Sequence, residues 1–139
     1  VEKHPDAFQP KTLRRLLAGA EVDAAIYHAA QREMDRLRRT ADEVFESVDV
    51  VVTPTTPILP FAFGFPFSGS ETDADLRSGE ILSLRNTRPF NANGLPAISI
   101  PCGVTEAGIP IGMQLVGPAG GESVVLRLAH AYEVRTRTT

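Results

Sequence analysis

Hydrophobic and polar residues follow a helical period in the first third of the chain. Apolar side chains recur three or four positions apart, at Ile26, Ala30, Met34, Leu37, Ala41 and Val44. This spacing is typical of one helix face that packs against a core. Asp23 precedes the stripe and is a favourable N-cap residue. The pattern therefore predicts one long helix, from about Ala24 to Glu46.

Three shorter helices are predicted from weaker signals. The first begins at Pro10, which suits the first helical position, and ends near Gly19. A second covers residues 79–90, where Pro89 limits its length. The last covers residues 122–135, with apolar side chains gathered on one side.

Three strands are predicted from short β-branched and apolar runs. Residues 48–53 (VDVVVT) have the composition of a strand that is buried on both faces. Residues 97–101 and 111–116 form two more strands, and the short turn-forming connection between them favours an antiparallel hairpin. Helices on either side of these strands indicate an α/β fold with a mixed sheet. Three strands would leave sheet edges unpaired, so the chain is expected to belong to a larger sheet.

The long loop over residues 54–80 contains a regular aromatic series. Phenylalanines occupy every second position at Phe61, Phe63, Phe65 and Phe67, among prolines and glycines. Two interpretations remain open for them. They line an apolar pocket, or they fill one end of the core.

Composition and charge exclude several functional classes. The 139 residues include 14 basic and 17 acidic side chains, for a net charge of −3. This balance indicates neither nucleic acid nor a membrane surface as a partner. Because no apolar run approaches roughly 18 residues, no transmembrane helix is expected. The single cysteine excludes an internal disulfide and indicates a reducing compartment, so a cytoplasmic location is predicted.

Local motifs for catalysis are weak throughout the chain. Cys102 follows a predicted strand, but a thiol nucleophile needs a neighbouring base, and no histidine stands beside it in sequence. We therefore interpret it as a small buried hydrophobic residue, with a cysteine hydrolase as the rival hypothesis. The three histidines have no metal-ligand spacing, so no metal is expected. Residues 117–123 precede a helix and either hold an anion or form its entry loop, and the entry loop is favoured.

Three ordered motifs closely resemble the carboxyl-terminal third of amidase-signature enzymes. They are residues 48–57 (VDVVVTPTTP), 91–103 (NANGLPAISIPCG) and 108–117 (GIPIGMQLVG). The likeness extends over nearly the whole chain and is least distinctive over residues 58–84. It implies a partial amidase-signature fold, in which residues 1–139 form the carboxyl-terminal portion of the domain.

The resemblance also implies a chemistry and a missing part. Enzymes of this family hydrolyse amide bonds with a serine nucleophile, and a lysine acts as base through a second serine held in a cis peptide. No cofactor takes part. The lysine and the glycine- and serine-rich segment lie upstream of the matched region, and this chain has only Lys3 and Lys11, both ahead of the first motif. No catalytic residue is therefore assigned here.

The family's pocket-facing stretch corresponds to residues 85–91 (RNTRPFN). On this basis Thr87, Phe90 and Asn91 are predicted to bind substrate, although Thr87 and Asn91 can instead order the loop. Family members that use glutamine to amidate charged transfer RNA carry an acidic residue three positions before the threonine. Leu84 occupies that position here, which favours a general amidase.

The leading hypothesis is a carboxyl-terminal amidase fragment that supplies sheet core and a wall of the substrate pocket. Its expected partners are the missing amino-terminal part of the enzyme and a small-molecule amide, and a homo-oligomer is left open. The alternative is a stand-alone binding or scaffold module of amidase ancestry.

Overall fold

The computed structural model describes residues 4–61, 79 and 81–136, which fall into two compact units. Residues 1–37 belong to the first unit and residues 38–139 to the second. The predicted assignment of the whole chain to one domain portion remains a prediction.

The first unit consists of helices. A 3-10 turn, Pro5–Ala7, precedes α1, Pro10–Ala20, and α2 then runs from Ala24 to Glu43 across the boundary between the units. Pro10 lies at the start of α1, as predicted. The Asp23 carboxylate accepts a hydrogen bond from the Ala25 N–H at 2.8 Å, which confirms the predicted N-cap of α2.

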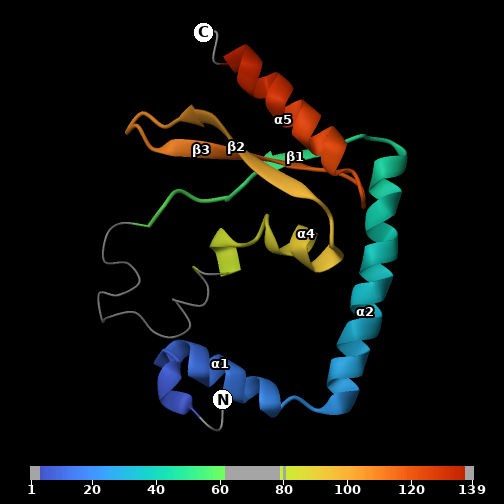
Figure 1. Ribbon diagram of the computed structural model, residues 1–139, viewed down its shortest axis with the longest axis vertical. Helices are drawn as coiled ribbons and strands as arrows, with labels where there is room; N and C mark the ends of the chain where they lie inside the picture. The colour runs from blue at the N-terminus through green and yellow to red at the C-terminus, as the bar shows by residue number, and fades with distance from the viewer. Residues whose placement is uncertain (1–3, 62–78, 80, 137–139) are drawn as a thin grey trace. The chain divides into compact units, whose positions relative to one another are not determined.

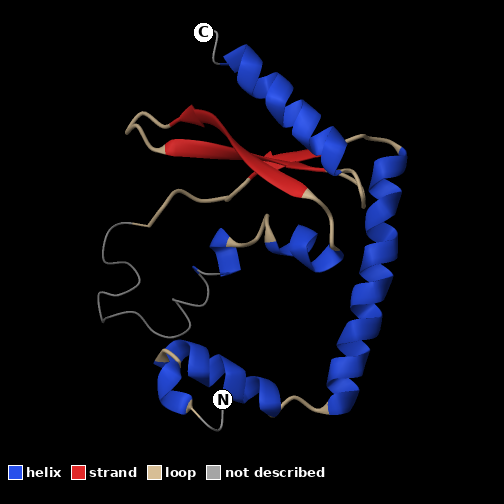
Figure 2. Cartoon of the chain, viewed as in Figure 1, coloured by secondary structure: helices blue, strands red, loops and turns tan. Residues whose placement is uncertain are grey.

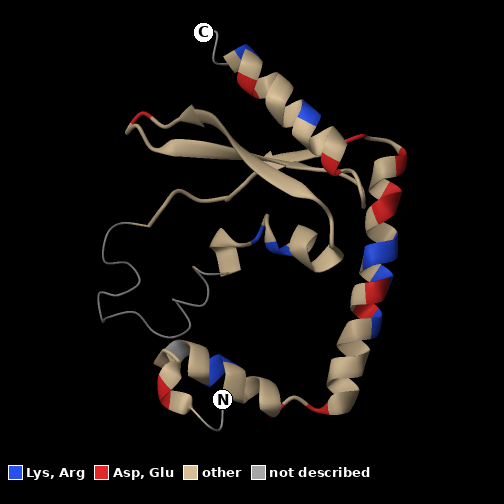
Figure 3. Cartoon of the chain, in the orientation of Figure 1, with Lys and Arg blue, Asp and Glu red and all other residues tan. Residues whose placement is uncertain are grey.

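The apolar stripe of α2 is not buried as predicted. Within the described part of the chain no residue of α2 is buried, and Ile26 is 66% exposed. The helix is also shorter than predicted, because a 3-10 turn, Val44–Glu46, replaces its last residues. Figure 3 shows acidic and basic residues interleaved along α2. Glu33 and Arg36 form an exposed ion pair there, whose hydrogen bond lowers the pKa of Glu33 and raises that of Arg36.

The second unit is built on a three-stranded sheet with the order β1-β3-β2 (Figures 1 and 2). The strands are β1, Val51–Pro54, β2, Ala97–Val104, and β3, Pro110–Val116. The α/β class and the β2–β3 hairpin are confirmed. Both described strand pairs are antiparallel, so the parallel pairing that a mixed sheet requires is not found among the described strands.

The core lies between the sheet and α5, Glu122–Thr136. Ile100 and Leu115 pack there against Val125 and Ala129, and all four side chains are at most 5% exposed. Helix α5 makes its main contacts with β2 and β3, whereas β1 lies at the far edge of the sheet. Val52 pairs with Leu115 in the sheet and therefore points to the same face as α5. Because α5 does not extend over β1, Val52 is 54% exposed. The prediction that the first strand is buried on both faces is therefore wrong for this chain.

The segment before the hairpin also differs from the prediction. A helix over residues 79–90 was expected, with Pro89 limiting it. Instead, four turn residues separate a helical stretch at 81–83 from α4, Arg88–Asn93. Pro89 lies in the first turn of α4, where its missing N–H leaves no helical bond unmade. Gly94 ends α4 in the left-handed region with φ of 73°, a conformation that glycine adopts readily because it has no Cβ.

Replacement of Leu115 by alanine tests the core. The side chain is 1% exposed, and its truncation leaves a cavity, so Leu115→Ala is expected to lower the free energy of unfolding by about 3 kcal/mol. The matched control is Leu126→Ala on α5, where the side chain is 57% exposed and the loss should stay below about 0.5 kcal/mol. Urea unfolding followed by circular dichroism measures both. Equal losses would contradict this placement of the core.

Candidate functional site

The sheet face opposite α5 carries hydroxyl and amide side chains. Antiparallel register places Thr53 and Ser99 on either side of Gln114 in the central strand. Directly opposite residues share a face, whereas Leu115, one residue along, points to the α5 side. Thr55 extends the group, because its Oγ1 lies 2.6 Å from Ser99 Oγ. We call Thr53, Thr55, Ser99 and Gln114 the polar row.

The polar row contacts the segment that contains the predicted site residues. Gln114 Nε2 donates to Thr53 Oγ1 at 3.0 Å and to the Asn86 carbonyl at 2.8 Å. Asn86 Nδ2 in turn donates to the Pro54 carbonyl at 2.9 Å. These bonds join residues 84–93, including α4, to the face opposite α5, and Figure 1 shows α4 and α5 on opposite sides of the sheet.

Thr87, Phe90 and Asn91 lie within one turn at the start of α4. Their positions i, i+3 and i+4 belong to one face of a helix, and the Asn91 N–H donates to the Thr87 carbonyl at 3.3 Å. Thr87 and Phe90 are half-buried and Asn91 is exposed. The Thr87 hydroxyl donates to the Leu84 carbonyl at 3.4 Å, which is a loop-ordering contact. Substrate binding by these three residues remains a prediction.

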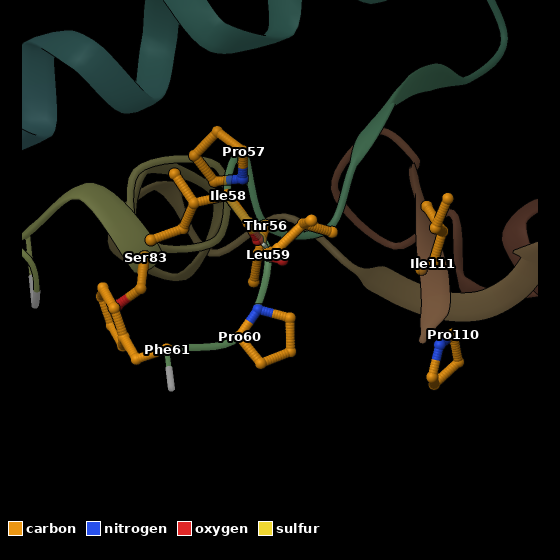
Figure 4. Close-up of a pocket in the computed structure, with 10 residues that line it drawn as sticks. Thr56, Pro57, Ile58, Leu59, Pro60, Phe61, Ser83, Pro110 and Ile111 are labelled. Carbon is orange, nitrogen blue, oxygen red and sulfur yellow. Dashed lines mark hydrogen bonds between the residues drawn. The ribbon is translucent and has the colours of Figure 1, made fainter. Parts of the chain in front are cut away.

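A separate apolar pocket of about 500 Å³ opens beside the hairpin (Figure 4). Its walls come from residues 56–61, which follow β1, from Ser83 and from residues 110–112 of β3. All of these lining side chains are uncharged, and Thr56 and Ser83 contribute hydroxyl groups. The pocket suits the apolar part of a small molecule, because apolar walls with a few polar groups are typical of ligand sites.

One member of the phenylalanine series lines this pocket, whereas the three predicted site residues do not. Phe61 lines it, which agrees with the pocket interpretation for that residue. The predictions for Phe63, Phe65 and Phe67 lie outside the described residues. Thr87, Phe90 and Asn91 are not among the lining residues.

Cys102 is exposed, in contrast to its interpretation as a buried residue. The register of β2 against β3 shifts between Pro101 and Gly103, so Cys102 is the extra residue of a β-bulge. A bulge interrupts the strand alternation that would have turned the side chain inward. Its Sγ donates to the Ile111 carbonyl over 3.5 Å, a weak contact that supplies no base for a nucleophile.

The loop over residues 117–121 is a close-packed entry to α5. The Val124 and Val125 N–H groups both donate to the Gly121 carbonyl. A Cβ on Gly117 would lie 2.6 Å from a Val125 methyl group, so glycine is needed for this approach. These contacts support the entry-loop interpretation over anion binding. Among the described residues, no cluster of three or more potential metal ligands was found, and no helix there has the length and hydrophobicity to cross a membrane.

Sequence reasoning did not identify the polar row. The signal was present, because Gln114 is a lone amide inside the otherwise apolar run of β3, and it is only 4% exposed. Its partner Asn86 lies 28 residues away, and no local pattern connects the two.

Comparisons with known proteins give one consistent result. A family model described as Amidase matches residues 2–126. A glutamyl-tRNA(Gln) amidotransferase subunit of Synechococcus sp. (strain CC9605) is 41% identical over 133 residues, which are 92% of this chain and 26% of that protein. The chain thus spans about a quarter of the length of the curated relatives that it matches.

Solved structures agree with this match. A crystal structure of an amidase is similar with a TM-score of 0.77 at 29% identity, and the likeness covers 96% of this chain and 30% of that one. A structure of 6-aminohexanoate cyclic dimer hydrolase complexed with substrate is similar with a TM-score of 0.63 at 30% identity, over 79% of this chain and 24% of that one.

Replacement of Gly112 tests the polar row. A Cβ at this position would lie 2.8 Å from Thr55 Oγ1 and 3.0 Å from Ser99 Oγ, so it would separate the two hydroxyls. Gly112→Ala is expected to destabilise the sheet by about 1–3 kcal/mol in urea unfolding. Gly19→Ala is the control, because nothing lies within 4 Å of its Cβ and alanine favours a helix. An unchanged stability for Gly112→Ala would contradict this packing.

Proposed function

The chain belongs to the amidase family, and we propose that it forms the carboxyl-terminal portion of an amide-bond hydrolase whose serine nucleophile lies in an amino-terminal portion. The observation that carries this proposal is that the family model matches nearly all of this chain, whereas the chain matches only a small share of a relative's length. The family model matches residues 2–126 of this chain, whereas the chain corresponds to only 26% of a 41%-identical relative. A chain of this kind supplies part of a reaction centre that the rest of the fold completes.

The exposed apolar side chains support the proposal that another part of the polypeptide covers them. Ile26 and Tyr27 on α2 and Val52 on β1 are more than half exposed. Apolar exposure of this kind is costly in water and is typical of surfaces that another polypeptide covers. The amino-terminal part of the amidase is the proposed cover. The alternative of a stand-alone scaffold module would leave these side chains in solvent.

The proposed substrate is a small uncharged amide. The pocket beside the hairpin has uncharged walls and would accommodate an apolar substituent, while Thr87, Phe90 and Asn91 would contact the polar part. Leu84 occupies the position where glutamine-using members of the family carry an acid. A second candidate is glutamine hydrolysis, which the similarity to a glutamyl-tRNA(Gln) amidotransferase favours. Location in the cytoplasm and self-association remain predictions.

Activity of a chimaera tests this function. Residues 1–139 replace the corresponding carboxyl-terminal quarter of the 41%-identical relative, and release of ammonia is measured from aliphatic and aromatic amides and from glutamine. We expect the chimaera to hydrolyse the apolar amides at least about tenfold faster than glutamine, as a pocket with apolar walls implies, while the isolated chain is inactive. A preference for glutamine would instead support the second candidate.

Two controls complete the test. Cys102→Ala in the chimaera should retain full activity, and its loss would revive the cysteine hydrolase hypothesis. Turnover by the isolated chain would show that it contains its own reaction centre, and would reject the proposal. A folded isolated chain that resists aggregation, together with an inactive chimaera, would favour the scaffold alternative.

A further inference from the structure

Gln114 is the one buried polar residue among the described side chains. It lies in the central strand, where an apolar side chain of similar volume would need no hydrogen-bonding partner. A buried amide is costly unless its donors are satisfied. Both of its observed bonds are donated by Nε2, one within the sheet to Thr53 and one out of the sheet to Asn86. What the amide adds to the sheet is therefore a fixed attachment point for Asn86.

The segment from residue 84 to 93 is held by side chain–backbone hydrogen bonds from three separate parts of the second unit. Gln114 of β3 donates to the Asn86 carbonyl, and Asn86 Nδ2 donates to the Pro54 carbonyl of β1. Arg38 Nε donates to the Ala92 carbonyl at 3.2 Å. Within the described chain, α4 has no fully buried residue and Phe90 is half-buried, so hydrogen bonds contribute to its position beside partial packing.

The bond from Gln114 differs from the other two in its surroundings. The Arg38 and Asn86 bonds are exposed, where water competes for the same groups. The Gln114 bond is the shortest of the three at 2.8 Å and is made by a side chain that is only 4% exposed. In such an environment a hydrogen bond is stronger, and its loss leaves a carbonyl without an equivalent partner. Asn86 immediately precedes Thr87, so the fixed carbonyl sets where α4 begins.

We propose that Gln114 is a positioning residue that fixes Asn86 and thereby places Thr87, Phe90 and Asn91 for the amide substrate. The substrate in this inference rests on the proposed function. The attachment of residues 84–93 by Gln114 is independent of that function. Loss of the hydrogen bond from Gln114 to Asn86 does not affect the nucleophile, but it lets the predicted contact residues move. The consequence is weaker substrate binding with an unchanged chemical step.

Hydrogen exchange on the full 139-residue chain tests the attachment directly. Gln114→Met keeps the length of the side chain and removes its donors. We expect amide exchange of residues 86–95 to become about five- to tenfold faster, as the loss of one such hydrogen bond implies, while exchange of α5 stays unchanged. Gln31→Met is the matched control, because Gln31 Nε2 donates to the Tyr27 hydroxyl on exposed α2. Unchanged exchange over residues 86–95 would overturn the proposal.

Gln114→Leu provides a second variant if Gln114→Met does not fold. It also removes the Nε2 donor to the Asn86 carbonyl, and the same local increase in exchange is expected. Uniformly faster exchange across the sheet and α5 in this variant would indicate a general stabilising role instead, and would also overturn the proposal.

Steady-state kinetics of the chimaera test the positioning role. For both variants KM for the amide should rise about tenfold, with kcat within about twofold of the parent value. A fall in kcat at constant KM would contradict positioning, because a merely structural defect lowers the amount of active enzyme. If the unsubstituted chimaera is inactive, the proposed function fails, and the exchange experiment still decides whether Gln114 holds the segment.

Discussion

The antiparallel pairing of β3 with strands on both of its sides is the constraint on which the second unit depends. Successive side chains of a strand point to opposite faces, so this one strand serves two different layers. Leu115 contributes to the apolar core under α5, and its neighbour Gln114 bonds to the segment on the opposite face. A shift of one residue in the register would exchange these two side chains and destroy both layers.

The two layers are held by different forces. The α5 side depends on apolar burial, which tolerates small adjustments of position because it is non-directional. The opposite side depends on hydrogen bonds of 2.6–3.0 Å among hydroxyls, amides and backbone carbonyls, which require defined geometry. Gly112 lies beneath the Thr55–Ser99 contact and leaves room for it. This side therefore depends on defined geometry, which agrees with the positioning role proposed for Gln114.

The core is small, which agrees with the finding that the chain spans only about a quarter of its relatives' length. Only Ile100, Leu115, Val116, Val125 and Ala129 are buried hydrophobic residues among those described, although 42% of the chain is hydrophobic. The described strands contain no charged residue, and the charges concentrate on α2 and other helices (Figure 3). Uncharged strands with exposed apolar side chains are typical of the interior of a larger domain. The relatives, of which this chain spans about a quarter, have the length to provide it.

The sequence by itself determined the family, the order of most helices and strands, the N-cap of α2 and the β2–β3 hairpin, because each of these depends on residues close together in the chain. Only the tertiary structure decided that Val52 and the α2 stripe are exposed, since burial depends on what else covers a face. It also decided the exposure of Cys102, which a bulge reverses, and the bond between Gln114 and Asn86, which lie 28 residues apart. The periodicity of a sequence shows which face of a helix or strand is apolar. The contacts that cover that face are made by segments far apart in the chain, so only the tertiary structure shows them.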